Sequence, residues 1–163
     1  KRAVNLLLSS STTEAFNVAA EPVALRERYG ETINGMSLLL ARRLVEAEVP
    51  FITVFWKGDT ALNKKCKSAG SWDTHCNNFG CLKSHLLPEF DRGFSALIED
   101  LSERELLDET LLLVSSEMGR TPKIGDRRSG GKAAKRGQKR QVTAHAGANE
   151  NWRSVGVLFD DGR

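Results

Sequence analysis

A carboxylate and an imidazole stand two residues apart near the middle of the chain, at Asp73 and His75. In an extended backbone, side chains two residues apart point to the same side, so this pair can present two ligands to one cation. The competing interpretation is a polar turn in which the carboxylate of Asp73 accepts hydrogen bonds from backbone amides. The motif alone therefore leaves a metal-binding and a structural role open.

A second polar pair, Glu117 and Arg120, directly follows the apolar run of residues 110–116. That run predicts a buried strand, and so does the β-branched and aromatic run of residues 51–56, whose outgoing loop carries Asp73 and His75. Open α/β sheets bind ligands at the carboxyl ends of their strands, so both pairs are expected at one sheet edge. The alternative is that Arg120 pairs with Glu117 in a surface salt bridge of little energetic value.

Helices are predicted around these strands from the spacing of apolar residues. Residues 32–48 and 82–104 carry apolar side chains every three or four positions, which indicates two long amphipathic helices. On the first of them, Arg42, Arg43 and Glu46 are expected to face solvent. Two short helices within residues 1–17, separated by a Ser/Thr cap, and a helix from Pro22 to Arg28 precede it.

Two apolar strands joined by a helix form a βαβ unit, which predicts a parallel sheet with these strands as neighbours. Such sheets are covered on both faces, so their strands are expected to be buried nearly throughout. A two-stranded parallel sheet leaves both edges open, and further strands are needed. Residues 155–159 could form a short third strand. The expected fold is an incomplete α/β sheet of one domain, covering residues 1–131.

Charge divides the chain into an acidic body and a basic segment. The net charge is +3, and residues 123–140 hold eight basic residues against Asp126, which is +7 and leaves −4 on the remainder. Residues 132–140 are rich in Gly, Lys and Arg, and residues 132–163 are expected to form a basic tail that is either disordered or aberrant in sequence. This distribution argues against a specific nucleic-acid binder and confines any polyanion affinity to that segment. No apolar run approaches the roughly 20 residues of a membrane helix.

The thiols offer one more possible site. Cys66, Cys76, Cys81 and His85 could together bind a structural zinc ion, although their spacing is loose. Three cysteines give no complete disulfide framework, so unpaired thiols are the expected state and the redox compartment stays open. His145 is expected to be a solvated residue of the tail.

Several separate runs resemble the bacterial family catalogued as domain of unknown function 1501. They are residues 37–47 (Ser-Leu-Leu-Leu-Ala-Arg-Arg-Leu-Val-Glu-Ala), 70–75 (Gly-Ser-Trp-Asp-Thr-His) with 77–79 (Asn-Asn-Phe), 86–97 (Leu-Leu-Pro-Glu-Phe-Asp-Arg-Gly-Phe-Ser-Ala-Leu), 106–110 (Leu-Leu-Asp-Glu-Thr) and 116–124 (Ser-Glu-Met-Gly-Arg-Thr-Pro-Lys-Ile). The runs occur in the family's order, and the resemblance covers the chain from Lys1 to about Gly131.

The resemblance implies a partial parallel-sheet sandwich of the alkaline phosphatase and sulfatase type. It implies a metal-dependent hydrolase of phosphate or sulfate esters, with Asp73, His75 and Glu117 as ligands of a divalent metal such as zinc or calcium. Arg120 would meet the anionic ester as a catalytic residue. The family also implies export to the periplasm or beyond. The chain is thus expected to be a fragment of such an enzyme, inactive by itself.

One departure favours a different function. Where the family continues with Gly-Arg-Asp-His-Trp, this chain has Ala148-Asn149-Glu150-Asn151-Trp152, so an Asp-His pair is replaced. A ligand set without its histidine binds metal weakly. The alternative expectation is therefore a non-catalytic protein that keeps the fold for binding.

Overall fold

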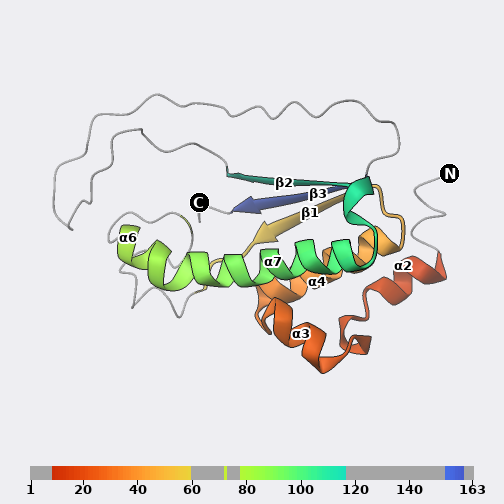
Figure 1. Cartoon of the computed structure of the whole chain (residues 1–163), viewed down its shortest axis with the longest axis horizontal. Coiled ribbons are helices and arrows are strands. Elements are labelled where there is room, and N and C mark those ends of the chain that lie inside the picture. Colours follow the sequence, from red (N-terminus) through yellow and green to blue (C-terminus); the bar gives the residue numbers. More distant parts are fainter. Residues whose placement is uncertain (1–8, 60–71, 73–77, 117–152, 160–163) are drawn as a thin grey trace. The chain divides into compact units, whose positions relative to one another are not determined.

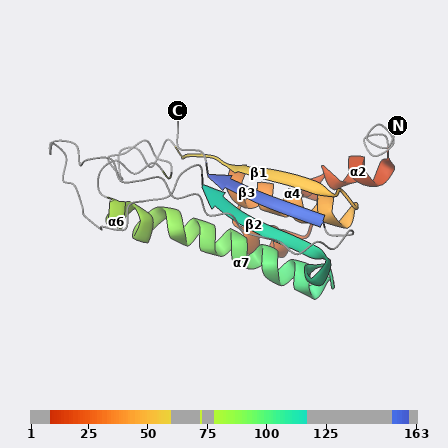
Figure 2. The same ribbon diagram turned by 90° about the horizontal axis from the view of Figure 1, so that it is seen from above.

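A computed structural model describes residues 9–59, 72, 78–116 and 153–159 of the 163-residue chain. These residues form an α/β fold with a small three-stranded parallel sheet (Figures 1 and 2). The helices and strands, in chain order, are α2 (Ser10–Ala15), η1 (Val18–Ala20), α3 (Val23–Tyr29), α4 (Ile33–Glu46), β1 (Phe51–Trp56), α6 (Asn78–Cys81), η2 (Leu82–Leu86), α7 (Leu87–Glu103), η3 (Leu107–Glu109), β2 (Thr110–Ser116) and β3 (Arg153–Phe159). None of the described helices is long and apolar enough to cross a membrane.

The two long helices and the two apolar strands expected from the sequence are present. Helix α4 begins at the cap Thr32, whose hydroxyl accepts a hydrogen bond from the amide of Gly35 at 3.1 Å. The second long helix is one helical run, α6–η2–α7, in which η2 is a π-helical turn. At the N-terminus, the hydroxyl of Ser9 accepts a hydrogen bond from the amide of Thr12 and caps α2. The shorter helix expected before it lies outside the described residues.

The strand order is β1–β3–β2, so the expectation that β1 and β2 are neighbours is wrong. Strand β3 comes from the last part of the chain and lies between them, which makes it the central strand. Residues 153–159 therefore belong to the sheet, and they include residues 155–159, for which the sequence suggested a short third strand. The α7 crossover skips one strand position, and the C-terminal segment fills that position.

Burial alternates along β1, which differs from the continuous burial expected of a strand in a doubly covered sheet. Ile52, Val54 and Trp56 are buried, whereas Phe51 and Phe55 are 70% and 60% exposed. Helices α4 and α7 lie on one side of the sheet in both views (Figures 1 and 2). Alternate side chains of a strand point to opposite faces of a sheet, so the burial pattern is that of a strand covered on one face. Within the described residues, only one face of the sheet is covered.

Two glycines allow helices α3, α4 and α7 to pack closely. A Cβ atom at Gly35 would lie 2.1 Å from the carbonyl oxygen of Gly30 and 2.3 Å from that of Tyr29, at the end of α3. A Cβ atom at Gly93 of α7 would lie 3.0 Å from Leu38 Cδ1 of α4. The backbones therefore approach to distances that any larger side chain would prevent.

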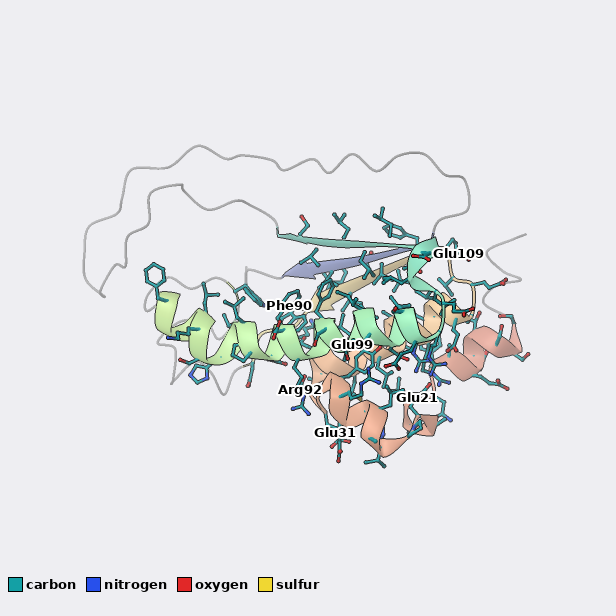
Figure 3. All side chains as sticks on the ribbon, in the orientation of Figure 1. Glu21, Glu31, Phe90, Arg92, Glu99 and Glu109 are labelled. Atoms are coloured by element: carbon teal, nitrogen blue, oxygen red, sulfur yellow. The ribbon has the colours of Figure 1, made fainter. Side chains whose placement is uncertain are left out.

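A buried cluster of ion pairs lies among the same helices, and it corrects the expectation that Arg42 faces solvent. The side chain of Arg42 is 0% exposed. Its guanidinium lies 2.7 Å from Glu21 Oε1 and 2.8 Å from Asp100 Oδ2, and it also pairs with Glu46. Arg42 can be buried because carboxylates at the end of η1, on α4 and on α7 compensate its charge. Glu21 is labelled in Figure 3.

The neighbouring Arg43 joins the N-terminal helices to α4. It pairs with Glu21 and donates hydrogen bonds to the carbonyl oxygens of Ala15 and Glu14, each at 2.8 Å. Its side chain is 16% exposed, so it too departs from the expected solvent-facing position, whereas the side chain of Glu46 is 41% exposed. Two consecutive arginines thus hold the segment before α3 against α4.

The chain divides into two compact units. In the first, the described residues are α2 to α4, most of α7, η3 and the amino-terminal parts of the strands. In the second, the described residues are the carboxyl ends of β1, β2 and β3, together with Trp72, α6 and η2. The second unit is the part of the protein in which the sequence places its candidate ligands.

Candidate functional site

The carboxyl ends of the three strands form one edge of the sheet. Because the strands are parallel, Trp56 of β1, Ser116 of β2 and Phe159 of β3 all end at that edge (Figure 1). Parallel α/β sheets bind ligands at this edge. A residue that directly follows one of these strands is therefore attached to the chain at the edge where ligands are expected to bind.

Trp72 is the described residue nearest in sequence to the Asp73–His75 motif, and it packs against the end of β1. Its ring and that of Trp56 meet edge to face, with centroids 6.4 Å apart and planes at 80°. This is a favourable arrangement for two aromatic rings. Trp72 also packs against a buried pair, Cys81 and Leu86, at the start of the long helix. The chain is thus brought back to the carboxyl end of β1 one residue before Asp73.

The predicted site residues themselves, Asp73, His75, Glu117 and Arg120, lie outside the described residues. Two of them are covalent neighbours of described ones: Asp73 follows Trp72, and Glu117 follows Ser116, the last residue of β2. Consecutive Cα atoms are about 3.8 Å apart. The Cα atom of Asp73 is therefore that distance from the Cα atom of Trp72, and the Cα atom of Glu117 is that distance from the Cα atom of Ser116.

Because β3 is the central strand, the carboxyl ends of β1 and β2 are farther apart than those of neighbouring strands. Neighbouring strands lie about 4.8 Å apart, so the ends of β1 and β2 are separated by about 10 Å rather than by one strand spacing. Asp160 and Asp161 follow β3 directly in the sequence and lie outside the described residues. They are not among the site residues predicted from the sequence, because the order of the strands was not known. Two adjacent carboxylates directly after an apolar strand were the signal that could have found them.

The thiol-based zinc site is not supported, because Cys81 is disulfide-bonded. The expectation of unpaired thiols is wrong for this residue, and a sulfur in a disulfide has no thiolate to offer a metal. Cys66 and Cys76 lie outside the described residues. His85 is a half-buried residue of η2. His145 also lies outside the described part of the chain.

The acidic residues of the first unit are engaged by arginines rather than arranged for a metal. Asp100 is 2% exposed; it accepts hydrogen bonds from Tyr29 Oη at 2.9 Å and Arg104 Nε at 2.7 Å, in addition to its ion pair with Arg42. Burial raises the pKa of Tyr29 far above its ordinary value, and the charge of Asp100 adds to the shift. Among the described residues, no group of three or more His, Cys, Asp or Glu side chains is arranged to hold a metal ion.

The pKa of Glu21 is lowered by its two arginine partners, Arg42 and Arg43. Burial alone would raise this pKa, but hydrogen bonds and attraction from Arg42 and Arg43 outweigh burial and leave it below 4.5. The carboxylate is therefore held ionised within the helical unit. This cluster stabilises the scaffold of the sheet and leaves the carboxyl-terminal edge as the candidate site.

Comparison with curated proteins and with solved structures gives no match for this chain. Residues 1–135, which are most of its length, match the family described as protein of unknown function (DUF1501). The matched region includes α2 to β2, Trp72 and the predicted ligands Asp73, His75 and Glu117. The chain therefore belongs to the DUF1501 family.

Proposed function

We propose that the protein is part of a sulfatase-like, metal-dependent hydrolase of phosphate or sulfate esters, from a branch of the alkaline phosphatase superfamily. The observation that carries this proposal is the packing of Trp72 against Trp56 at the carboxyl end of β1. It supports a position of Asp73 and His75 at the same sheet edge as Glu117, the residue after β2. The distance between β1 and β2 fits a site that spans the end of β3.

The proposed ligands have the chemistry that a divalent cation needs. Asp73 and Glu117 offer carboxylate oxygens, and His75 offers an imidazole nitrogen, the donor types that bind zinc and similar metals. Asp160 and Asp161 follow the central strand and are proposed as further oxygen donors. A site about 10 Å wide also has room for two cations about 3.5–4 Å apart. The donor set thus fits a divalent metal.

Arg120 is proposed to bind the ester itself. Its planar guanidinium can donate two parallel hydrogen bonds to the non-bridging oxygens of a phosphate or sulfate group. A bound divalent metal would neutralise charge on the transferring group and lower the pKa of an attacking water or hydroxyl. Arg120 would hold the ester in line for that attack, and the alcohol would leave on the opposite side. The proposed substrate is accordingly an anionic ester.

We also propose that the protein works in an oxidising compartment outside the cytoplasm. The disulfide at Cys81 supports this location, because disulfides persist in exported proteins and are rare in reducing cytosol. A measurement of free thiols in protein isolated from its native compartment tests the proposal. Three reactive thiols per chain in the freshly isolated protein would contradict it.

Turnover of aryl phosphate and aryl sulfate esters, with and without a chelator, tests the proposed activity. In the complete enzyme of which this chain is proposed to be part, we expect chelator-sensitive release of the aryl alcohol, and we expect Asp73→Asn and Glu117→Gln to abolish it. Asp108→Asn is the matched control, because Asp108 is an exposed residue of η3, just before the amino end of β2. Equal turnover by Asp73→Asn and the control, or turnover untouched by chelator, would rule out the proposal.

The alternative is a non-catalytic member of the family that keeps the fold for binding. It is favoured by Asn149 to Trp152, which stand where the family has its Arg-Asp-His-Trp run. Metal content after purification separates the two functions. Stoichiometric metal without turnover of either ester favours the binding protein, and metal with turnover favours the hydrolase.

A further inference from the structure

The segment from Ser9 to Glu21 packs on helix α4 with little apolar contact. It contains α2 and η1, and both of these elements contact α4. The structure describes the whole segment, and Ala15 is its only buried apolar side chain, whereas Phe16 is 60% exposed. Segments with few buried apolar contacts open locally at a lower cost than the whole fold. Polar contacts must therefore hold this segment in place.

Arg43 of α4 makes two of these contacts. Its guanidinium donates hydrogen bonds to the carbonyl oxygens of Glu14 and Ala15, each at 2.8 Å. The carbonyl groups at the C-terminal end of a helix carry partial negative charge, so a cation is favoured there. Arg43 thus binds the end of α2 through its backbone.

The carboxylate of Glu21 makes the remaining contacts, and it lies between two guanidinium groups. Its Oε1 is 2.7 Å from Nη2 of Arg42 and also accepts a hydrogen bond from Nη1 of Arg43. The side chain of Arg42 is 0% exposed and that of Arg43 is 16% exposed. One oxygen therefore joins two largely buried cations of α4 to the segment before α3.

Glu21 also balances the charge of the cluster. Asp100 and Glu46 each pair with Arg104 and with Arg42. Without Glu21, the two arginines of α4 and Arg104 would share two carboxylates. One positive charge would then be left uncompensated in a largely buried position, which is unfavourable unless another anion takes the place of Glu21.

We infer that Arg42 and Arg43 form a carboxylate-binding site that the chain fills with its own Glu21, and that residues 9–21 are a strap that opens from α4 when this carboxylate leaves. The inference does not depend on the proposed hydrolase activity. Guanidinium groups match the charge and the planar shape of a carboxylate. A small free carboxylate such as formate can therefore bind there once Glu21 is removed.

Hydrogen exchange of the full chain, followed by mass spectrometry, tests the strap. In the wild type, amides of residues 10–20 should exchange about 10- to 100-fold faster than those of Leu97 and Leu101, which are buried in α7. Glu21→Ala should speed exchange of the strap by about a further 10- to 100-fold, because charge-assisted hydrogen bonds are lost, and α7 should change less. Glu27→Ala, at an exposed glutamate of α3, should change neither.

Chemical rescue tests the carboxylate site. Sodium formate should restore most of the protection that Glu21→Ala loses, whereas sodium chloride at the same ionic strength should not. Arg43→Gln is the matched control, because it removes half of the site and leaves Arg42 paired. Its strap should also exchange faster than that of the wild type, but formate should not slow it.

Three results would overturn the inference. Equal exchange rates of residues 10–20 and α7 in the wild type would show that the segment opens only with the whole fold. A Glu21→Ala protein that is unfolded in both salts would show the same. Equal effects of formate and chloride on a folded Glu21→Ala protein would show that Arg42 and Arg43 form a structural ion pair and bind no free carboxylate.

Discussion

The guanidinium Nε of Arg42 lies 2.8 Å from Oδ2 of Asp100, and both side chains are buried, at 0% and 2% exposed. This ion pair joins α4 to α7, the two helices on one side of the sheet, and Tyr29 and Arg104 complete the partners of Asp100. Removing one member of a buried pair leaves a charge without compensation. The pair therefore holds together the scaffold from which the strands run to the candidate site.

Arg42→Met should destabilise the protein by about 3–5 kcal/mol, because Asp100 and Glu21 would lose their shared buried cation. The control is Arg28→Met. Arg28 also bridges two carboxylates, Glu99 and Glu103, but its side chain is 37% exposed, so the loss should stay at about 0–1 kcal/mol. Urea unfolding of both variants measures the difference, and equal losses would contradict the role given to the buried pair.

Stability should fall in acid partly through Glu21. The pKa of this group is lowered in the folded protein from an ordinary value of 4.5, so its stabilising contribution is fully present above about pH 4.5. The contribution disappears as the pH falls through the lower, folded-state pKa. Glu21→Gln should flatten the decline in unfolding free energy below pH 4.5, as measured by urea titrations between pH 3 and 7. Glu27→Gln, at an exposed glutamate of α3, should leave the steeper wild-type decline in place.

Gly35→Ala should cost about 1–3 kcal/mol, because the new methyl group would overlap the carbonyl oxygens of Gly30 and Tyr29. Gly156→Ala in the central strand is the matched substitution, since a Cβ there would meet Ile52 O at an ordinary 3.8 Å. Its effect should stay within about 0.5 kcal/mol. Chemical unfolding compares the two, and a neutral Gly35→Ala would show that the helices can separate without loss.

Glu105→Gly should stabilise the protein by about 0.5–1 kcal/mol. Helix α7 ends with Glu105 at φ 60°, and the amides of Glu105 and Leu106 donate to the carbonyls of Ser102 and Leu101 at 3.0 and 2.8 Å. This is the helix-ending motif in which glycine is preferred, since the left-handed conformation costs other residues about 1–2 kcal/mol. Ser102→Gly, within the helix, should lower Tm instead. A lower Tm for Glu105→Gly would contradict the prediction.

The parts of the fold that depend on local periodicity were predictable from the sequence. Apolar spacing found α4 and the helix ending in α7, and β-branched and apolar runs found β1 and β2. The burial of Arg42 was not predictable, because its partners Glu21 and Asp100 are distant in sequence and only packing brings them together. A long charged side chain on an amphipathic helix ordinarily faces water.

The order of the strands was likewise beyond local reasoning. Residues 153–159 follow a long Gly- and Lys-rich stretch, and nothing in their own pattern places them between β1 and β2. The odd number of cysteines gave no indication that Cys81 is paired. For the candidate site, the sequence identified the strand ends and the residue types, whereas the packing of Trp72 on Trp56 required the fold.

Crystals soaked with Mn²⁺ or Zn²⁺, with data collected at the absorption edge of the metal, would locate the proposed metal ion. We expect an anomalous peak at the carboxyl ends of the strands, within about 2.0–2.2 Å of carboxylate oxygens of Asp73 or Glu117. A peak bound only by residues of other regions, or no peak at full soak concentration, would contradict this expectation.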